Sequence, residues 1–413
     1  MFAFLKLAAR NIMRHKRRNM LTGLMICVGT VTMILTLAYG QSVERGLSNA
    51  VIQTITGNIQ IHAAGEQKIE VLNPQDDEAS MLASEDRVRA LVAQERGVAA
   101  VAPRLRFGAL LSTGEESAGV AVLAVDPMLE AKVSPRLKVA QGSYLTKDNG
   151  ILLGKRIART LNIGIGDELI LLANNPDGYL NALNLEVQGI VAAEGMEMFL
   201  GNMVYITIAA GRKLLYLPED EAYEVVVALK EGTSEKAVIE KLRQKFDAEG
   251  LKLRVDSWKD LASVICSIMM VNKTLPLMFL AILLLVVAVG IINTVMMSVL
   301  ERTREIGTMM ALGTTRKQVL GIFLLETGVL SAIAAGTGLM IGAAIIFWLS
   351  RTGIPAVVEA MEFSFGGKRL YLVFDWPGLL ASFAAIILLS VLAALFSARR
   401  VARLKPVEAL HSN

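Results

Sequence analysis

Four long apolar runs constrain the fold of this chain more than any other feature of its sequence. They occupy residues 20–39, 275–300, 319–349 and 379–396. About 20 apolar residues in a helix cross the roughly 30 Å hydrocarbon core of a bilayer, so each run is long enough to be a transmembrane span. The chain is 54% hydrophobic and only 19% charged, which excludes an ordinary soluble protein. A membrane protein with four transmembrane α-helices is therefore predicted.

The lysine and arginine residues predict which side of the membrane each segment faces. The first 20 residues contain six basic residues and no acidic residue. Two further basic groups follow the second and fourth runs, at Arg302, Arg304, Arg316 and Lys317 and at Arg399, Arg400, Arg403 and Lys405. Cytoplasmic loops carry an excess of such residues, so we expect these groups and both termini in the cytoplasm. An even number of spans predicts the same, and a basic stretch of this kind gives no reason to expect a nucleic-acid partner.

The spans divide the chain into segments that alternate between the two sides. Residues 1–19 mix basic and apolar residues and predict an amphipathic helix in the cytoplasmic interface, with a solvated basic tail as the alternative. The expected order continues with a first span at 20–40, an outside domain at 41–256, a stalk helix and second span at 257–300, a cytoplasmic loop at 301–318, a third span at 319–350, a short outside loop at 351–376, a fourth span at 377–398 and a cytoplasmic tail at 399–413.

The sequence of the expected outside domain predicts a mixture of strands and helices. Residues 58–62 alternate polar and apolar side chains, as a half-buried strand does. Further strands are expected at 98–111, 120–125, 169–172, 185–190 and 203–208, and helices after Ser84, at 156–161, into which residues 150–154 lead, and at 234–246. Strands and short helices without a long βαβ repeat favour a large α+β domain, which we expect to have two lobes.

A polar stretch separates two of these strands. It consists of Asn174, Asn175, Pro176, Asp177, Gly178 and Tyr179. The simpler interpretation is a long hairpin loop, and the alternative is a projecting loop that grips a partner.

Apolar residues recur at helical spacing from Trp258 to Met269, so the second span is expected to begin as a stalk at Ser257. A helix from there to Leu300 would be about 65 Å long, roughly twice the hydrocarbon thickness. Such a rod suits force transmission better than a pore.

The third run contains two features that concern packing. Gly338 and Gly342 have the small-residue spacing that lets two transmembrane helices approach closely. Glu326 is the one acidic residue of this run. An acid inside a membrane is usually functional, but this run is longer than needed, so an interfacial, structural position is favoured for Glu326.

The sequence has none of the motifs that would indicate an enzyme. A Walker A sequence, HExxH, GxSxG and paired metal-ligand spacings are all absent, and the two cysteines, Cys27 and Cys266, form no disulfide framework. We therefore expect no catalytic site, no metal and no cofactor in this chain.

Several segments resemble the FtsX-like permease domain. The most specific is residues 293–307, which ends in Glu-Arg-Thr-Arg-Glu-Ile-Gly, followed by Ala311-Leu312-Gly313, Val319 and Leu325-Glu326. Residues 9–18 and 398–410 resemble the two ends of that family. Residues 57–61, Asp126-Pro127, 142–145, Ala158 with Leu161, and Gly166-Asp167 resemble the periplasmic domain of MacB-type and LolC/LolE-type permeases.

This resemblance implies a permease subunit of a type VII, mechanotransmission ABC transporter in a bacterial inner membrane. Such permeases pair with a second, identical or paralogous, permease and with two cytoplasmic ATPase subunits that bind ATP and Mg. The layout is most similar to LolC/LolE, so lipoprotein release to a periplasmic carrier is the first expectation. MacB-like efflux with an outer-membrane partner, and FtsX-like regulation of a periplasmic hydrolase, are the alternatives.

The resemblance also implies two groups of functional residues. ATPase coupling is expected of Glu301, Arg302, Arg304, Glu305, Ile306, Gly307, Leu312, Gly313 and Arg316. If the substrate is a lipoprotein, a groove for acyl chains is expected at the outer halves of the first two spans, where the candidates are Leu35, Leu37, Met270, Leu277 and Met278. Plain lipid or helix contact is the alternative for these five.

Overall fold

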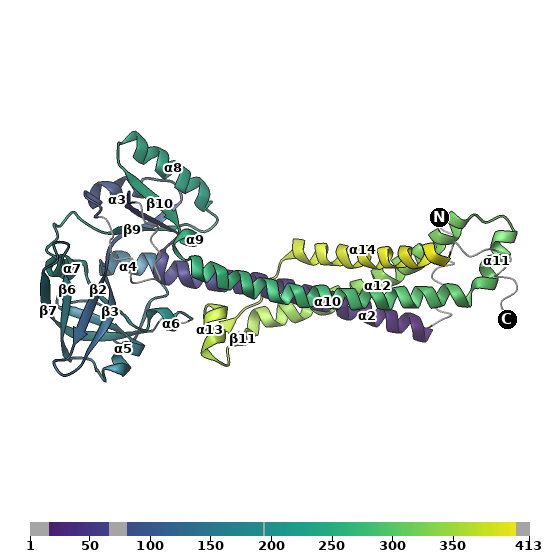
Figure 1. Cartoon of the computed structure of the whole chain (residues 1–413), viewed down its shortest axis with the longest axis horizontal. Coiled ribbons are helices and arrows are strands. Elements are labelled where there is room, and N and C mark those ends of the chain that lie inside the picture. Colours follow the sequence, from purple (N-terminus) through teal and green to yellow (C-terminus); the bar gives the residue numbers. More distant parts are fainter. Residues whose placement is uncertain (1–15, 66–80, 193–194, 402–413) are drawn as a thin grey trace. The chain divides into compact units, whose positions relative to one another are not determined.

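The computed structural model describes residues 16–65, 81–192 and 195–401, which form two compact units (Figure 1). We call the first the helical unit; it comprises Met1–Ser42, Val271–Ile354 and Tyr371–Asn413. The second, the sheet unit, comprises Val43–Met270 and Pro355–Leu370. Most of the interfacial helix predicted at 1–19, and all but three residues of the tail at 399–413, lie outside the described residues.

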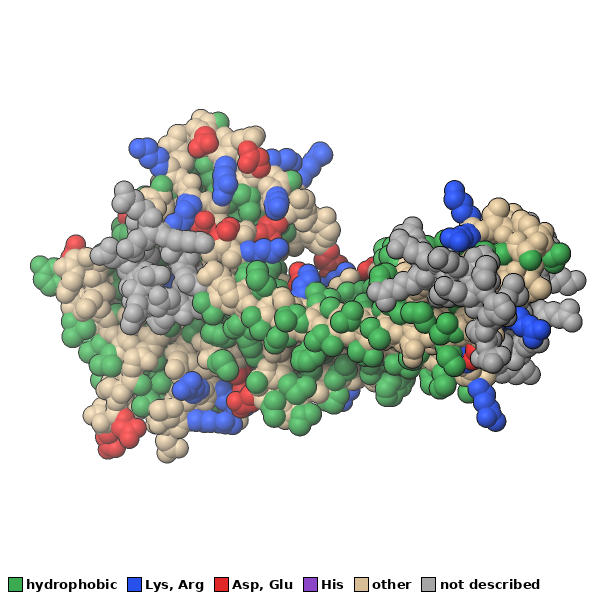
Figure 2. Space-filling view, turned by 45° about the vertical axis from the view of Figure 1, so that its right-hand side comes forward, with side chains coloured by type: hydrophobic (Ala, Val, Ile, Leu, Met, Phe, Trp, Pro, Cys, Tyr) green, Lys and Arg blue, Asp and Glu red, His purple; other side chains and the backbone are tan. Residues whose placement is uncertain are grey.

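Four helices of the described chain are long and apolar enough to cross a membrane. They are α2 (Lys16–Val51), α10 (Ser263–Glu301), α12 (Arg316–Thr352) and α14 (Trp376–Val401). The four predicted spans are thus confirmed as helices, and each helix of this set extends beyond its apolar run. Hydrophobic side chains gather along these helices in Figure 2, as expected of surfaces that face lipid.

The core of the helical unit lies between these helices. Its buried members include Ile26 of α2, Ile291 of α10, Ala335 of α12 and Ile386 of α14. A short helix, α11 (Thr303–Ala311), joins α10 to α12, and its apolar side chains pack against the same core. The helical unit is therefore one packed bundle in which α11 takes part.

The sheet unit is built on a mixed sheet, part of which closes on itself. Its closed part is a ring in which β6 pairs with both β2 and β7, so the described strands of this part form a small six-stranded barrel. The ring follows the order β2 (Val98–Ser112), β3 (Ser117–Val125), β8 (Met203–Thr207), β5 (Gly150–Gly154), β7 (Leu180–Ala192) and β6 (Glu168–Asn174). Alternate strand residues fill its interior, as barrel geometry requires.

A second lobe of the sheet unit is an antiparallel sheet covered by two helices. The first half of β2 continues into it, and the strand order is β10 (Leu253–Ser257), β1 (Ile59–Ala63), β9 (Glu224–Leu229) and β2. The helices α3 (Glu85–Ala93) and α8 (Glu235–Ala248) bury Val88, Val92, Val238, Leu242 and Phe246 against this sheet. The predicted α+β domain with two lobes is confirmed.

A buried ion cluster lies where β2 passes from one lobe to the other. Arg104 is fully buried and donates from Nε and Nη2 to both carboxylate oxygens of Glu130, at 2.9 and 2.7 Å. Its Nη1 lies 3.6 Å from Oε1 of Glu224 on β9. Burial alone would raise the pKa of Glu224, but the neighbouring Arg106 and Arg104 outweigh it and hold the pKa below its ordinary value. The cluster ties β2, β9 and α4 (Pro127–Val133) together.

The remaining elements are short. They are η1 (Ile52–Thr56), β4 (Lys138–Gly142), α5 (Lys155–Thr160), α6 (Glu197–Leu200), α7 (Ile208–Leu215), α9 (Trp258–Leu261), β11 (Ile354–Pro355), α13 (Glu359–Phe365) and β12 (Arg369–Leu370). The last three occupy the segment predicted as a short loop at 351–376.

Two local expectations differ from the structure. The helix predicted from Ser257 is interrupted, because Ser257 and Asp260 form a capping box around α9 and Ala262 then leaves the helical conformation before α10 begins. Ser84 precedes α3 as predicted, but its backbone is left-handed at φ 59° and its side chain caps nothing.

Candidate functional site

The predicted cytoplasmic loop at 301–318 is a helix bounded by two turns. Arg302 leaves the helical conformation between α10 and α11, and the Thr303 hydroxyl donates to the carbonyl of Leu300 at 2.7 Å. After α11 the chain reverses at Gly313, whose φ of 98° suits glycine, and whose amide donates to the carbonyl of Met310 at 3.1 Å. The loop is therefore an ordered element.

The two faces of α11 differ in character. Ile306 and Met310 pack against the core of the helical unit. Arg304 is exposed on the other side of the helix, and Leu312, just beyond its end, is 87% exposed. The exposed side of α11 and its C-terminal end therefore present both a basic and an apolar side chain to solvent.

Arg302 has a different environment from that of Arg304. Its Nη1 donates to Oε2 of Glu326 on α12 at 3.0 Å, and its Nη2 reaches Oε1 at 3.4 Å. Both residues are buried, so the charge of Arg302 is paired inside the helical unit. Glu326, for which the sequence favours a structural position, is the partner that fixes the base of α11.

A second ion pair lies beside the first. Arg18 of α2 donates to Glu301 at the end of α10, and also to the hydroxyl of Ser298 at 2.6 Å. The predicted coupling residues thus fall into two sets. Glu301 and Arg302 bind other helices of the unit, whereas Arg304, Leu312 and Arg316 are exposed.

Gly307 of α11 has little exposed surface, yet a Cβ added to it would meet no atom within 4 Å beyond its own helix backbone and chain neighbours. The glycine is therefore not required for packing inside this chain. The structure does not describe the side chain of Glu305.

The structure places Gly338 and Gly342 of α12 against α2. A Cβ at Gly338 would lie 2.8 Å from both the carbonyl oxygen of Cys27 and the Cβ of Thr30. One turn along, a Cβ at Gly342 would lie 3.3 Å from Cγ2 of Ile34. The two glycines let these helices approach backbone to backbone.

The candidate groove residues differ in exposure. Leu35 and Leu37 are half-buried, and Leu37 lines a small hollow of about 20 Å³ near Gln41 and Asp375. Met270, Leu277 and Met278 are exposed. The division into units separates Met270, which belongs to the sheet unit, from the other four.

The polar stretch from Asn174 to Tyr179 is the turn of the β6–β7 hairpin. Asn175 organises it, since its Oδ1 accepts from the amide of Tyr179 at 2.8 Å and its carbonyl accepts from the amide of Gly178 at 2.9 Å. Pro176 and Asp177 complete the turn, and the ring of Tyr179 projects outward. The hairpin interpretation fits this geometry, and the exposed tyrosine leaves a partner-binding role as a prediction.

The sequence did not indicate how the segment between α12 and α14 packs. Residues 355–370 belong to the sheet unit, where Arg136 donates to the carbonyl of Gly366 at 2.7 Å and the ring of Phe363 lies 5.3 Å from that of Phe199. A Cβ at Gly46 of α2 would overlap the carbonyl of Phe365. We call residues 355–370 the strap. Its Gly366-Gly367 pair was the signal that could have revealed this close packing.

Comparison with known proteins assigns both halves of this architecture. Residues 277–406 match the FtsX-like permease C-terminal family, and residues 20–245 match the MacB-like periplasmic core domain family. The fold and these matches define a multi-pass ABC transporter permease. The chain belongs to the family of permeases that carry a MacB-like periplasmic core domain.

The relatives differ in how much of their length this chain matches. It is 25% identical over 423 residues to the uncharacterized ABC transporter permease YknZ of Bacillus subtilis, covering 98% of both chains. It is 30% identical to the uncharacterized permease MJ1507 of Methanocaldococcus jannaschii, covering 51% of this chain and 50% of that one. The macrolide export ATP-binding/permease protein MacB of Nitrosomonas europaea is 28% identical, with 67% of this chain and 40% of that protein covered.

A solved structure is also similar to the middle of the chain. The periplasmic region of MacB from Actinobacillus actinomycetemcomitans is 13% identical, covers 54% of this chain and 97% of its own, and gives a TM-score of 0.37.

Proposed function

We propose that this chain is the permease subunit of an ABC export system and that α11 receives motion from a cytoplasmic ATPase. One observation carries the proposal: α11 is packed on one side and pinned at its base by the buried Arg302–Glu326 pair, while Arg304 and Leu312 are free of the bundle and exposed. A helix held in this way moves with the bundle when a partner pushes on its exposed face.

The connections between the two units support transmission of that motion. Both α2 and α10 contribute residues to the helical unit and to the sheet unit, and the strap adds a third connection from α12 and α14. An α-helix is hydrogen-bonded along its whole length, so it resists stretching. We propose that cytoplasmic ATP binding displaces these helices and that the sheet unit, on the outer side of the membrane, performs the work.

The expected assembly contains two permease subunits and two ATPase subunits, with ATP and Mg bound by the ATPases. For the load, efflux with a partner outside the membrane is the better supported alternative, since relatives include proteins named for macrolide export and for pyoverdine export. Lipoprotein release to a carrier is supported only by the resemblance in layout.

Photo-crosslinking in living cells tests the coupling proposal. A benzophenone amino acid replaces Leu312, and the control carries it at Met128, an exposed residue of the sheet unit. We expect mass spectrometry to identify an ABC ATPase in the crosslink from Leu312 and none from Met128. An ATPase captured equally at both positions, or at neither, would contradict the proposal.

Copurification with an ATPase-defective complex tests the load. An outer-membrane tunnel protein or its adaptor supports efflux. A bound lipoprotein would instead support lipoprotein release, and a cell-wall hydrolase would support the regulatory alternative.

A further inference from the structure

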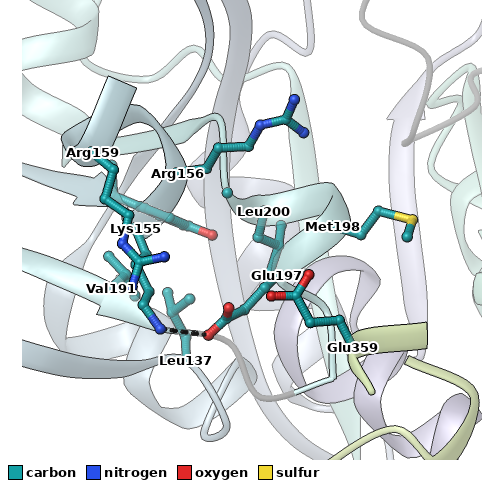
Figure 3. Close-up of a pocket in the computed structure, with 11 residues that line it drawn as sticks. Leu137, Lys155, Arg156, Arg159, Val191, Glu197, Met198, Leu200 and Glu359 are labelled. Carbon is teal, nitrogen blue, oxygen red and sulfur yellow. Dashed lines mark ion pairs between the residues drawn. The ribbon is translucent and has the colours of Figure 1, made fainter. Parts of the chain in front are cut away.

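The sheet unit contains an open cavity of about 330 Å³ on the outside of the barrel (Figure 3). Three basic residues of α5, namely Lys155, Arg156 and Arg159, line it. Across from them stand Glu197 of α6 and Glu359 of the strap. The volume lies at the lower end of the range of small-molecule pockets, about 300–1,000 Å³.

The inner wall of the cavity is apolar. Leu137, Val191 and Leu200 line it and are themselves buried in the core of the sheet unit. Met198, also in the lining, is 63% exposed. A ligand in this cavity would therefore meet apolar side chains on its inner side and charges around the opening.

The charges of the opening are not balanced. Lys155 pairs with Glu197, at 3.7 Å between Nζ and Oε1. In the described part of the chain, neither Arg156 nor Arg159 forms an ion pair, although both are exposed at the cavity and lie three residues apart on one helix. In Figure 3 the guanidinium of Arg159 is directed toward Lys155, whereas that of Arg156 points away from it. A guanidinium can bind an oxyanion through paired N–H groups.

The backbone around Arg156 is closely fitted. The amide of Ile157 donates to the carbonyl of Gly201 at 2.9 Å, which joins α5 to the end of α6. A Cβ at Gly201 would lie 2.8 Å from the Cβ of Arg156, and a Cβ at Gly154 would lie 2.5 Å from the carbonyl of Leu200. The absence of both side chains lets α5 and α6 meet closely enough to form one wall of the cavity.

We propose that this cavity binds a small organic anion with an apolar body, such as an alkyl phosphate or an alkyl carboxylate. Arg159 holds the anionic group, the exposed side chain of Arg156 turns toward it on binding, and the apolar body lies against Leu137, Val191 and Leu200. The inference concerns the sheet unit alone and goes beyond the coupling proposal, since it does not depend on which partner drives the permease.

Calorimetric titration tests this site. The full chain in phosphatidylcholine nanodiscs is titrated with hexyl phosphate, and empty nanodiscs give the blank. We expect saturable binding to the permease, weaker binding of inorganic phosphate, which lacks the apolar body, and no binding of hexanol, which lacks the charge. Hexanoate serves as the second probe: if it binds as well as hexyl phosphate, the site accepts organic anions generally, and if it does not, the site selects phosphate esters such as a lipid headgroup.

Variants decide whether the arginines are responsible. Arg156→Gln and Arg159→Gln together should weaken binding of hexyl phosphate by about tenfold or more for each arginine lost. The control, Arg96→Gln with Lys236→Gln, removes the same charge from exposed positions of the second lobe and should leave the affinity unchanged. An equal loss in both double variants, unchanged affinity in the first, or no heat above the blank would overturn the proposal.

Discussion

Arg302 and Glu326 form a buried, two-point ion pair that joins the turn before α11 to α12, with N–O distances of 3.0 and 3.4 Å. The residues are 24 positions apart, and each is 8% exposed. Because the pair lies at the base of α11, it sets the direction in which the exposed side of that helix faces. It therefore contributes to the stability of the helical unit, and under the coupling proposal it would also influence how α11 meets a partner.

Removing one member of this pair should destabilise the helical unit. Glu326→Gln leaves the guanidinium of Arg302 buried without a counter-charge, and breaking a buried pair in this way typically costs about 3–5 kcal/mol. We expect a lower thermal unfolding midpoint in detergent. The double variant Arg302→Met with Glu326→Leu should recover much of the loss, and the exposed Arg304→Gln should not change the midpoint. A stable Glu326→Gln protein would show that the pair contributes little.

Gly307 gives a test that separates stability from coupling. No neighbouring side chain limits this position, so Gly307→Ala should be tolerated, and the gain in helix propensity is about 1 kcal/mol. Gly307→Trp should leave the sheet unit folded but prevent an ATPase from approaching α11. The measurement is the ATPase activity of the complex reconstituted with the subunit that crosslinks to Leu312. Normal stimulation in the tryptophan variant would mean that the ATPase does not approach α11 closely at Gly307.

Glu305→Lys is the companion substitution. It reverses one charge of α11, and we expect it to reduce stimulation of the ATPase without changing the unfolding midpoint. Arg316→Glu reverses the charge of an exposed residue in the first turn of α12, and it serves as the matched comparison for Glu305→Lys.

The spans and the two-lobed domain were predictable because their signals are local. Apolar runs of sufficient length define α2, α10, α12 and α14, and alternation along the chain reveals strands such as β1. Closure of the barrel was not predictable, because it depends on β6 pairing with both β2 and β7. The strand β9 is a short apolar run that lies outside the predicted strands, since burial on both faces removes alternation.

The segment that joins the second and third spans could be recognised in the sequence, but the environments of its charges could not be separated there. Arg302 and Arg304 are two positions apart in a basic stretch and look equivalent. Only the packing of α12 shows that one is turned toward Glu326 while the other is exposed. The strap escaped prediction for the same reason, since its contacts with Arg136 and Phe199 join residues more than 150 positions apart.

Because α12 packs closely against α2, we expect a leucine substitution to lower stability at one glycine of α12 and not at another. Gly338→Leu places a side chain against the backbone of Cys27, and overpacking of this kind costs about 1–3 kcal/mol. Gly336→Leu is the matched control, because a Cβ there would meet nothing within 4 Å. We expect a lowered thermal midpoint in detergent for Gly338→Leu alone. Equal midpoints would show that the helices can separate without loss.

The environment of His62 leads us to expect that the stability of the sheet unit falls in acid. It is buried in β1, and burial lowers its pKa from the ordinary value of 6.5, although Glu224 and Asp256 beside it act in the opposite direction. Arg254 and Arg106 also face it and lower the pKa further. Because the unfolded chain binds a proton that the folded chain resists, the free energy of unfolding should be greatest above pH 6.5 and should fall as the pH drops from 6.5 toward the lowered pKa.

Fluorescence of Trp258 can follow this response in the full chain. Trp258 is buried in the sheet unit, while Trp348 and Trp376 belong to the helical unit and can be replaced by phenylalanine. Urea titrations across the interval from about pH 5 to 8, in which histidine changes charge, give the free energy of unfolding at each pH. His62→Gln removes the titrating group, so the slope below pH 6.5 should become flatter than in the parent. If the slope is the same in both proteins, His62 is not the group responsible for the loss of stability over this interval.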